Sequence, residues 1–300
     1  MKETLTADVF PGQGKSHQGM GEEIYKRHPV VRDVFEIASD RVGKNIARLC
    51  FEGPEIELKH GDFAQVAVVT VSFAGLRANE AEGEQDANVV AGHSLGQLTA
   101  GAAAGAVDFP DAVTLAFERG RLMKQQAQKE PGFMTAILGL TLDRVERICR
   151  EAGVEISNIN TENQIVIGGR KALMGIASSL ANRYRKSRVR VFPVDVGDIA
   201  SHTSLMRPLE SPFTEAVNGV TIKDPRKPLI SGLTGKVITS ASDFRDDLVA
   251  QLYSTINWMK VVQTMVKNGV SEAREIGPGK VLSGLTRENT GDIKTRSQNL

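Results

Sequence analysis

Short apolar runs alternate with longer segments of helical periodicity over the first 130 residues. Residues 8–10 and 88–91 predict short buried strands, and each runs directly into a glycine-containing turn. Helices are predicted at residues 22–40, 63–78 and 111–126, where apolar side chains recur near a 3.6-residue period, and an alanine- and glycine-rich run covers residues 98–107. This alternation of strands and helices predicts an α/β domain.

Residues 132–196 follow a different pattern. The predicted strands are 134–140, 154–159, 164–167 and 188–194, and the predicted helices are 143–151 and 171–184. The order βαββαβ is that of a ferredoxin-like unit. We therefore predict a ferredoxin-like subdomain at residues 131–196, inserted into a larger α/β catalytic domain that is made of residues 1–130 and 197–300.

The pattern after the inserted unit is less regular. Residues 228–233 predict another buried strand, residues 244–265 predict a mostly helical segment, and residues 275–279 predict a turn. The polar tail from Thr286 onward is expected to be loosely held.

Composition and charge exclude several classes of protein. The 37 basic and 36 acidic residues give a net charge of +1 without a long basic run, so nucleic acid and membrane are not expected partners. The first nine residues are too polar for a secretory signal, and no apolar run has membrane-spanning length. Cys50 and Cys149 lack metal-ligand spacing. We therefore expect a cytoplasmic protein without a metal.

The strongest local motif is Gly92-His93-Ser94-Leu95-Gly96, which lies between a predicted strand and a small-residue helix. A nucleophilic serine on a sharp strand-to-helix turn needs small neighbours, because the turn is strained and crowded. Free N–H groups at the helix N-terminus would stabilise an oxyanion beside Ser94. The motif predicts a serine nucleophile, although a tight turn with an incidental serine also fits.

A serine nucleophile needs a base, and the chain has five histidines. His28 is predicted to lie in a charged helix, His60 in a polar loop and His17 in a glycine-rich loop, so none is favoured. The side chain of His93 is expected to point away from that of Ser94 and to support the turn or contact the substrate. Elimination leaves His202, for which a structural role fits as well.

Motifs along residues 8–287 resemble those of malonyl-CoA:acyl carrier protein transacylases and of polyketide synthase acyltransferase domains. The matching segments, in chain order, are Phe10 to Gly14, Gly19 to Gly21, Gly92 to Gly96, Arg119-Gly120 with Met123, Asn158, Asn160, Gln164 to Gly169, Ser201-His202 with Leu205-Met206, Gln251-Leu252 with Trp258, and Gly277-Pro278-Gly279 to Leu285. The resemblance implies an α/β-hydrolase-like large domain.

The resemblance also implies a ping-pong acyl transfer, in which Ser94 attacks a thioester and His202 takes and returns the proton. It implies that a backbone carbonyl at Gln251 orients the histidine, and that the N–H groups of Gln13 and Leu95 form the oxyanion hole. Arg119 would hold a substrate carboxylate with paired N–H groups, with His93 and Ser201 as further substrate-binding residues.

The implied substrate is malonyl-CoA, and the implied acceptor is the 4'-phosphopantetheine thiol of an acyl carrier protein. No cofactor is implied, and we expect a monomer. The sequence departs from the family pattern at Lys15-Ser16, at Gln97, where glutamate is usual, and at Ile199 to Ser201. Ala-Ser before the histidine resembles a methylmalonyl-selective pattern, so the C2 substituent stays open, although Leu95 after the serine favours malonyl.

Four alternatives remain open from the sequence. An acyl hydrolase that clears carrier proteins would use the same serine and histidine, but Arg119 suits a carboxylated acyl group better. An α/β-hydrolase esterase would need an HGGG-type loop, which we do not find. A catalytically silent docking module would not need the serine and histidine. The malonyl transferase subunit of malonate decarboxylase is a further relative.

Overall fold

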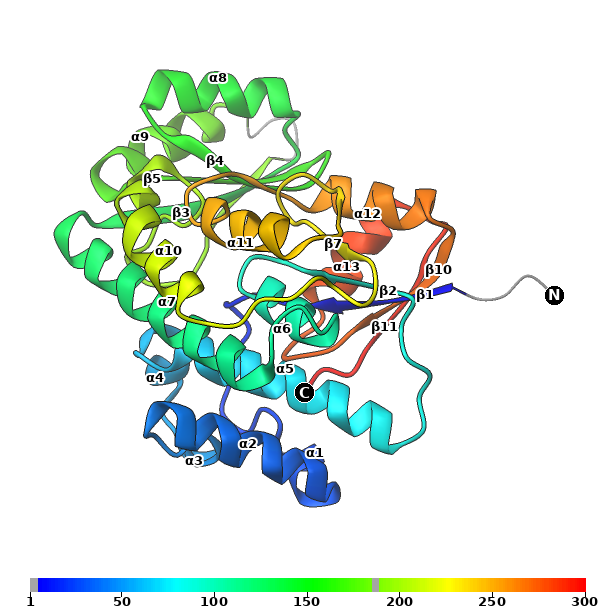
Figure 1. Cartoon of the computed structure of the whole chain (residues 1–300). Helices are drawn as coiled ribbons and strands as arrows, with labels where there is room; N and C mark the ends of the chain where they lie inside the picture. The colour runs from blue at the N-terminus through cyan, green and yellow to red at the C-terminus, as the bar shows by residue number, and fades with distance from the viewer. Residues whose placement is uncertain (1–4, 185–188) are drawn as a thin grey trace.

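The computed structural model describes residues 5–184 and 189–300, which form two β-sheets surrounded by helices. In Figure 1 the smaller sheet lies at the top beneath α8 and α9, the larger sheet lies in the middle, and α1, α2 and α3 lie at the opposite end. The α/β class with a second, smaller sheet unit is confirmed.

The larger sheet has six strands in the order β11-β10-β1-β2-β7-β8. All neighbours are parallel except β7 and β8, which are antiparallel. Its strands are β1 (Leu5–Phe10), β2 (Val89–Gly92), β7 (Leu229–Ile230), β8 (Val237–Ile238), β10 (Val270–Glu275) and β11 (Lys294–Ser297). Because β1 and β2 are central and parallel, the turns that follow them lie side by side at one edge of the sheet.

Helices cover both faces of the larger sheet. They are α1 (Glu22–Arg27), α2 (Pro29–Val42), α3 (Ile46–Glu52), α4 (Glu55–His60), α5 (Ala64–Ala81), α6 (Gly96–Ala103), α7 (Phe109–Lys129), α10 (Glu210–Asn218), α11 (Ala241–Ala250), α12 (Trp258–Lys267) and α13 (Val281–Asn289), with a 3₁₀ segment η2 (Ser204–Leu209). The smaller unit has its own helices, α8 (Leu142–Ala152) and α9 (Lys171–Asn182).

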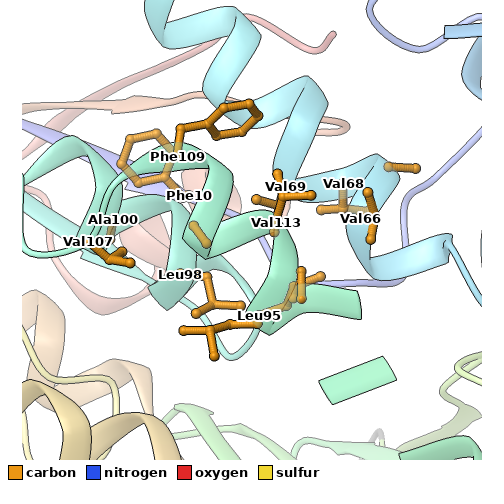
Figure 2. Close-up of a cluster of buried hydrophobic side chains, with 14 of the residues drawn as sticks. Phe10, Val66, Val68, Val69, Leu95, Leu98, Ala100, Val107, Phe109 and Val113 are labelled. Carbon is orange, nitrogen blue, oxygen red and sulfur yellow. The ribbon is translucent and has the colours of Figure 1, made fainter. Parts of the chain in front are cut away.

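Side-chain alternation along β1 divides the core in two. Phe10 joins the cluster formed with α2, α5, α6, α7, α10 and α11, whereas Ala7 and Val9 face the opposite cluster with α12 and α13. Successive side chains of a strand point to opposite faces, so the apolar residues of β1 contribute to the core on both sides of the sheet. Figure 2 shows Phe10 within the first cluster, together with Leu95 and Leu98 at the start of α6.

The smaller sheet has five strands in the order β6-β3-β5-β4-β9. Its strands are β3 (Gly132–Leu138), β4 (Glu155–Thr161), β5 (Gln164–Arg170), β6 (Arg190–Pro193) and β9 (Ile256–Asn257). The order βαββαβ predicted for this part of the chain is confirmed, while Arg188, the start of its last predicted strand, lies outside the described residues. Because β9 comes from beyond residue 196, the division at 131 and 196 stays a prediction.

Two predicted helices are wrong in their extent. The segment 22–40 forms two helices, because Pro29 forces the preceding His28 into an extended conformation with φ −120° and ψ 119°. The segment 244–265 contains β9 between α11 and α12. Its apolar pattern was compatible with helix throughout, and pairing of Ile256 and Asn257 with β4 decided the strand.

The prediction of a loosely held tail is also wrong. Residues 281–289 form α13, and β11 pairs with β10 in parallel. The strand β10 was missed as well, because its charged residues have partners that a sequence pattern does not reveal. Arg274 donates to both carboxylate oxygens of Asp8 on β1, and Glu275 accepts from the N–H groups of Leu282 and Ser283.

Within residues 5–184 and 189–300, no helix has both the length and the apolar character needed to span a membrane.

The Asp8–Arg274 ion pair gives a stability prediction. The Asp8 and Arg274 side chains are 1% and 6% exposed, and Arg274 Nε lies 2.6 Å from Asp8 Oδ1. In Asp8→Ala, Arg274 keeps its ion pair with Glu84 at 3.2 Å but loses two hydrogen bonds to a buried carboxylate, so the free energy of unfolding should fall by about 1.5–3 kcal/mol in urea denaturation. Glu23→Ala, which removes an exposed pair with Arg27, should cost less than about 1 kcal/mol. Equal losses in the two variants would contradict the argument.

Candidate active site

Ser94 lies on a sharp turn between the end of β2 and the start of α6, and its φ is 54°. This left-handed conformation is costly for a residue with a side chain. The turn is possible because glycines flank it. A Cβ on Gly92 would lie 2.1 Å from the Gln97 backbone nitrogen, and a Cβ on Gly96 would lie 2.0 Å from the Phe10 carbonyl oxygen. The close approach of α6 to β1 and β2 therefore fixes the serine.

His202 lies beside this serine, with Nε2 2.7 Å from Ser94 Oγ. The other ring nitrogen, Nδ1, faces the backbone carbonyl of Gln251 at hydrogen-bond distance. A carbonyl can only accept, so Nδ1 carries the hydrogen and Nε2 is free to accept the hydroxyl proton of Ser94. The backbone N–H of His202 also donates to the Leu252 carbonyl at 2.8 Å, which fixes the loop that carries the ring.

The environment of His202 keeps the ring neutral. Burial, followed by the positive charge of Arg119, lowers the pKa of His202 to about 3, although the hydrogen bond to the Gln251 carbonyl acts in the opposite direction. Because this pKa lies far below 7, the imidazole is unprotonated near neutral pH. The ring is therefore in the state that can take a proton.

Arg119, on α7, is 4% exposed and reaches the same serine. Its Nη2 donates to Ser94 Oγ at 3.2 Å, and its Nη1 donates to Gln65 Oε1 at 2.8 Å. Among the residues that the structure describes, no Asp or Glu lies within ion-pair distance of this guanidinium. Burial lowers the pKa of Arg119 to about 10, so the group stays cationic near pH 7. A buried cation without a carboxylate partner is suited to an anionic ligand.

Gln65 was not predicted from the sequence. It is 3% exposed on α5, and besides holding Arg119 its amide donates to Gln13 Oε1 at 3.3 Å. The available signal was a long polar side chain among the apolar residues that begin α5. Such a residue needs buried partners, and here the partner is the arginine.

Ser94, His202 and Arg119 line a cavity of about 410 Å³ between the larger sheet and the smaller sheet. Six of the predicted site residues line it: Gln13, His93, Ser94, Arg119, Ser201 and His202. Its opposite wall comes from β3, β4 and β5 of the smaller sheet, through Met134, Ala136, Asn158, Asn160, Gln164 and Val166. Leu95 and Gln251 do not line it, since Leu95 is buried at the start of α6 and Gln251 lies behind His202.

Two backbone donors are available near Ser94. Across residues 5–184 and 189–300, neither the N–H of Leu95 nor that of Gln13 donates to a protein acceptor. Leu95 occupies the N-cap of α6, where N–H groups are left free and the helix dipole favours negative charge. Both groups are therefore available to an oxyanion, and this use of them stays a prediction.

The remaining histidines are engaged elsewhere. His93 Nε2 lies 3.1 Å from Asn160 Oδ1, and burial lowers the pKa of this imidazole. The prediction that His28 lies within a helix is wrong, because this residue separates α1 from α2, and its Nε2 lies 3.0 Å from Glu82 Oε1. His60 Nε2 lies 2.7 Å from Asp195 Oδ1. His17 lies 3.2 Å from the Lys15 carbonyl. Of the five, only His202 has a contact with Ser94 Oγ.

In the part of the chain that the structure describes, no group of three or more His, Cys, Asp or Glu residues is arranged to hold a metal ion.

Comparisons with known proteins identify a family of similar sequences. A family model described as an acyl transferase domain matches residues 8–289. The malonyl CoA-acyl carrier protein transacylase of Haemophilus influenzae is 35% identical over 298 residues, covering 98% of this chain and 95% of that protein.

Two solved structures are also similar. One is a malonyl-transacylase in complex with a type II polyketide synthase acyl-carrier protein, with a TM-score of 0.94, 33% identity, and coverage of 99% of this chain and 96% of that chain. The other is the malonyl-CoA:acyl carrier protein transacylase of Xanthomonas oryzae, with a TM-score of 0.93, 34% identity, and coverage of 99% and 95%.

The glycine contacts give a prediction for the turn. In Gly96→Ala the new methyl group would meet the Phe10 carbonyl, and because backbone cannot yield cheaply, the free energy of unfolding should fall by about 1–3 kcal/mol or more. Gly284→Ala is the matched control, because that site in α13 has no atom within 4 Å, and alanine should stabilise the helix by up to about 1 kcal/mol. Thermal and urea denaturation of both variants measure the difference. A neutral Gly96→Ala would show that the turn is not tightly held.

Proposed function

The chain belongs to the acyl transferase family, and from this membership we propose that it moves a malonyl group from coenzyme A to an acyl carrier protein through an acyl-enzyme on Ser94. The acceptor atom is the 4'-phosphopantetheine thiol. The relatives described above carry the name of this activity, and one of them was solved with an acyl-carrier protein. Acyl exchange between thiols and a serine involves no net oxidation or reduction, so the proposal includes no cofactor.

One observation carries the proposal for the site. Ser94 Oγ lies 2.7 Å from the neutral imidazole of His202 and 3.2 Å from the buried guanidinium of Arg119. The first contact activates a nucleophile, and the second places a positive charge where the free carboxylate of a malonyl group would lie after attachment to Ser94. A plain acyl chain would leave this charge without a partner.

In the first half-reaction, Ser94 Oγ forms a bond to the thioester carbonyl carbon while His202 Nε2 takes the hydroxyl proton. The carbonyl oxygen becomes negative and accepts hydrogen bonds from the N–H groups of Leu95 and Gln13. The C–S bond then breaks, and His202 returns the proton to the departing coenzyme A thiolate. The product is a malonyl ester of Ser94.

The second half-reaction is the reverse sequence with a different thiol. His202 takes the proton of the pantetheine thiol, the sulfur attacks the ester carbonyl, and the proton returns to Ser94 Oγ as the C–O bond breaks. Throughout, Arg119 pairs with the distal carboxylate, and Gln65 holds the guanidinium. His93 and Ser201 line the same cavity and contact the acyl group or its thioester arm. We also propose that the protein acts as a monomer.

The relatives support the transferase over the alternatives drawn from the sequence. None of the three compared proteins is described as a hydrolase, an esterase or a malonate decarboxylase subunit. The acyl transferase domain match over residues 8–289 also includes every strand of the smaller sheet, so the family model accounts for that unit as well as for Ser94 and His202. Whether the site accepts a malonyl or a methylmalonyl group depends on the cavity wall near Ile199, and we propose malonyl.

The first test of the function is covalent labelling of Ser94. Intact-mass spectrometry after mixing with malonyl-CoA should show one malonyl adduct, and peptide mapping should place it on Ser94. Ser94→Ala should show no adduct and an unchanged fold. The control Ser204→Ala removes a hydroxyl outside the cavity and should label normally. Retention of the adduct in Ser94→Ala would overturn the assignment.

The second test concerns Arg119. A charge-assisted hydrogen bond contributes about 1.5–3 kcal/mol, and stranding a buried charge costs about 3–5 kcal/mol. Arg119→Ala should therefore lower kcat/KM for malonyl-CoA by a factor on the order of 10²–10³. The kcat/KM for acetyl-CoA, which lacks the carboxylate, should fall only slightly.

The control for this test is Arg121→Ala on the same helix. Arg121 pairs with Glu118 at 2.6 Å on the exposed side of the helix, so Arg121→Ala should leave kcat/KM unchanged for both malonyl-CoA and acetyl-CoA. If Arg119→Ala lowered malonyl and acetyl transfer equally, the guanidinium would be supporting the site without recognising the carboxylate, and the hydrolase would become the better proposal.

A further inference from the structure

A buried polar network lies beneath the turn that carries Ser94. It consists of Gln97 on α6, Ser231 just after β7, and Asp247 on α11, which are 0%, 3% and 7% exposed. None of the three lines the cavity. We refer to these residues as the Gln97–Ser231–Asp247 network. Polar side chains so deeply buried are costly unless they form specific hydrogen bonds, so their partners indicate their role.

Gln97 joins the turn to the neighbouring strand. Its Oε1 accepts from the backbone N–H of Gly92 at 3.2 Å, and its Nε2 donates to the Ile230 carbonyl at 3.2 Å. The amide orientation follows from these partners, because an N–H requires an acceptor and a carbonyl requires a donor. The backbone N–H of Gln97 also donates to the Ser94 carbonyl at 3.0 Å. One residue therefore holds the turn on both sides of the serine.

Ser231 continues the connection from β7 to α11. Its hydroxyl donates to Asp247 Oδ1 and accepts from the backbone N–H groups of Leu233 and Thr234 at 3.2 and 3.1 Å. One turn further along, the N–H of Gln251 donates to the Asp247 carbonyl at 3.1 Å. The carbonyl of Gln251 is the group that holds the ring of His202. The network thus connects the turn of Ser94 to the support of His202.

We propose that the Gln97–Ser231–Asp247 network positions Ser94 and His202 relative to each other, so that its residues act as positioning residues for acyl transfer. The inference rests on the function proposed above. Its physical basis is that Ser94 and His202 come from separate segments, the turn between β2 and α6 and the loop before η2. The distance between the two side chains therefore depends on how firmly β2, β7 and α11 are connected. Buried polar groups held by specific hydrogen bonds impose one geometry, which apolar packing does less strictly, and among the described residues only Asp247 Oδ2 of these three side chains lacks a partner.

The presence of glutamine at position 97 fits this role. An amide can accept from Gly92 and donate to Ile230 at once, whereas an ionised glutamate would place its charge against the Ile230 carbonyl. A second carboxylate would also lie close to Asp247. Burial already raises the pKa of Asp247 to about 6, against the opposing effects of the Ser231 hydroxyl and the Gln97 amide. The neutral amide is therefore compatible with its surroundings where a second charge is not.

The test replaces one link at a time. Gln97→Leu removes both side-chain hydrogen bonds at similar volume, and Ser231→Ala removes the link to Asp247. Each should lower kcat with malonyl-CoA, by up to a factor on the order of 10², because misplacement of about 1 Å costs that much. KM for malonyl-CoA should change by less than about 2-fold, since the cavity lining is untouched. The double variant should lose less than the product of the single losses.

Thr99→Val is the control on the same helix, because it removes a buried hydroxyl that has no hydrogen-bond partner among the described residues. It should keep the wild-type kcat. Wild-type kcat in Gln97→Leu or Ser231→Ala would overturn the proposal, as would a fall in kcat matched by Thr99→Val. If Gln97→Leu does not fold, Ser231→Ala decides the outcome.

The rate of labelling by a fluorophosphonate separates this inference from the proposed function. This probe reacts with Ser94 by the same base-assisted attack, with His202 taking the proton and fluoride leaving, and it needs neither malonyl-CoA nor a carrier protein. Slower labelling of Gln97→Leu and Ser231→Ala, with normal labelling of Thr99→Val, supports positioning even if malonyl transfer fails in the wild type. Equal labelling rates in all four proteins would refute the positioning role while leaving the transferase proposal intact.

Discussion

The site depends on how closely α6 approaches β1 and β2. Gly92 and Gly96 allow that approach, since a Cβ at either position would lie within about 2 Å of backbone atoms. The approach in turn supports the left-handed backbone of Ser94, which carries strain on the order of 1–3 kcal/mol. The apolar contacts of Leu95 and Leu98 with the main core hold α6 in place. The contacts of His202 and Arg119 with Ser94 Oγ follow from this arrangement.

The electrostatics of the site combine two opposing requirements. A general base must be unprotonated and still basic enough to accept a proton, whereas recognition of a carboxylate needs a positive charge nearby. Here Arg119 lies 3.2 Å from Ser94 Oγ, and its charge contributes to the low pKa of His202. In the proposed reaction the substrate carboxylate offsets that charge. The imidazole is then a stronger base when the carboxylated acyl group is bound than when the site is empty.

The sequence predicted the parts of the structure that depend on local patterns. The turn at Ser94, the helix at 111–126 and the βαββαβ unit were all visible from glycine placement and periodicity. The sequence could not reveal β10, because Arg274 is buried only through Asp8, which is 266 residues away, and Glu275 only through the N–H groups at the start of α13. The polar strand β11 is defined by its pairing with β10. Elimination among five histidines favoured His202, but its contact with Gln251 came from family resemblance. Gln65 was missed because its role is defined by Arg119.

The order of strands in the larger sheet has a consequence for synthesis on the ribosome. β1 lies in the middle of the sheet, and its ion-pair partner on β10 is 266 residues away. Strands β3 to β6 of the smaller sheet, in contrast, pair within a continuous stretch of chain. The smaller unit can thus begin to fold while the chain is still emerging, whereas β1 must wait for nearly the whole polypeptide before both its edges are covered. During that interval the apolar faces of β1 and β2 are the segments most in need of chaperone protection.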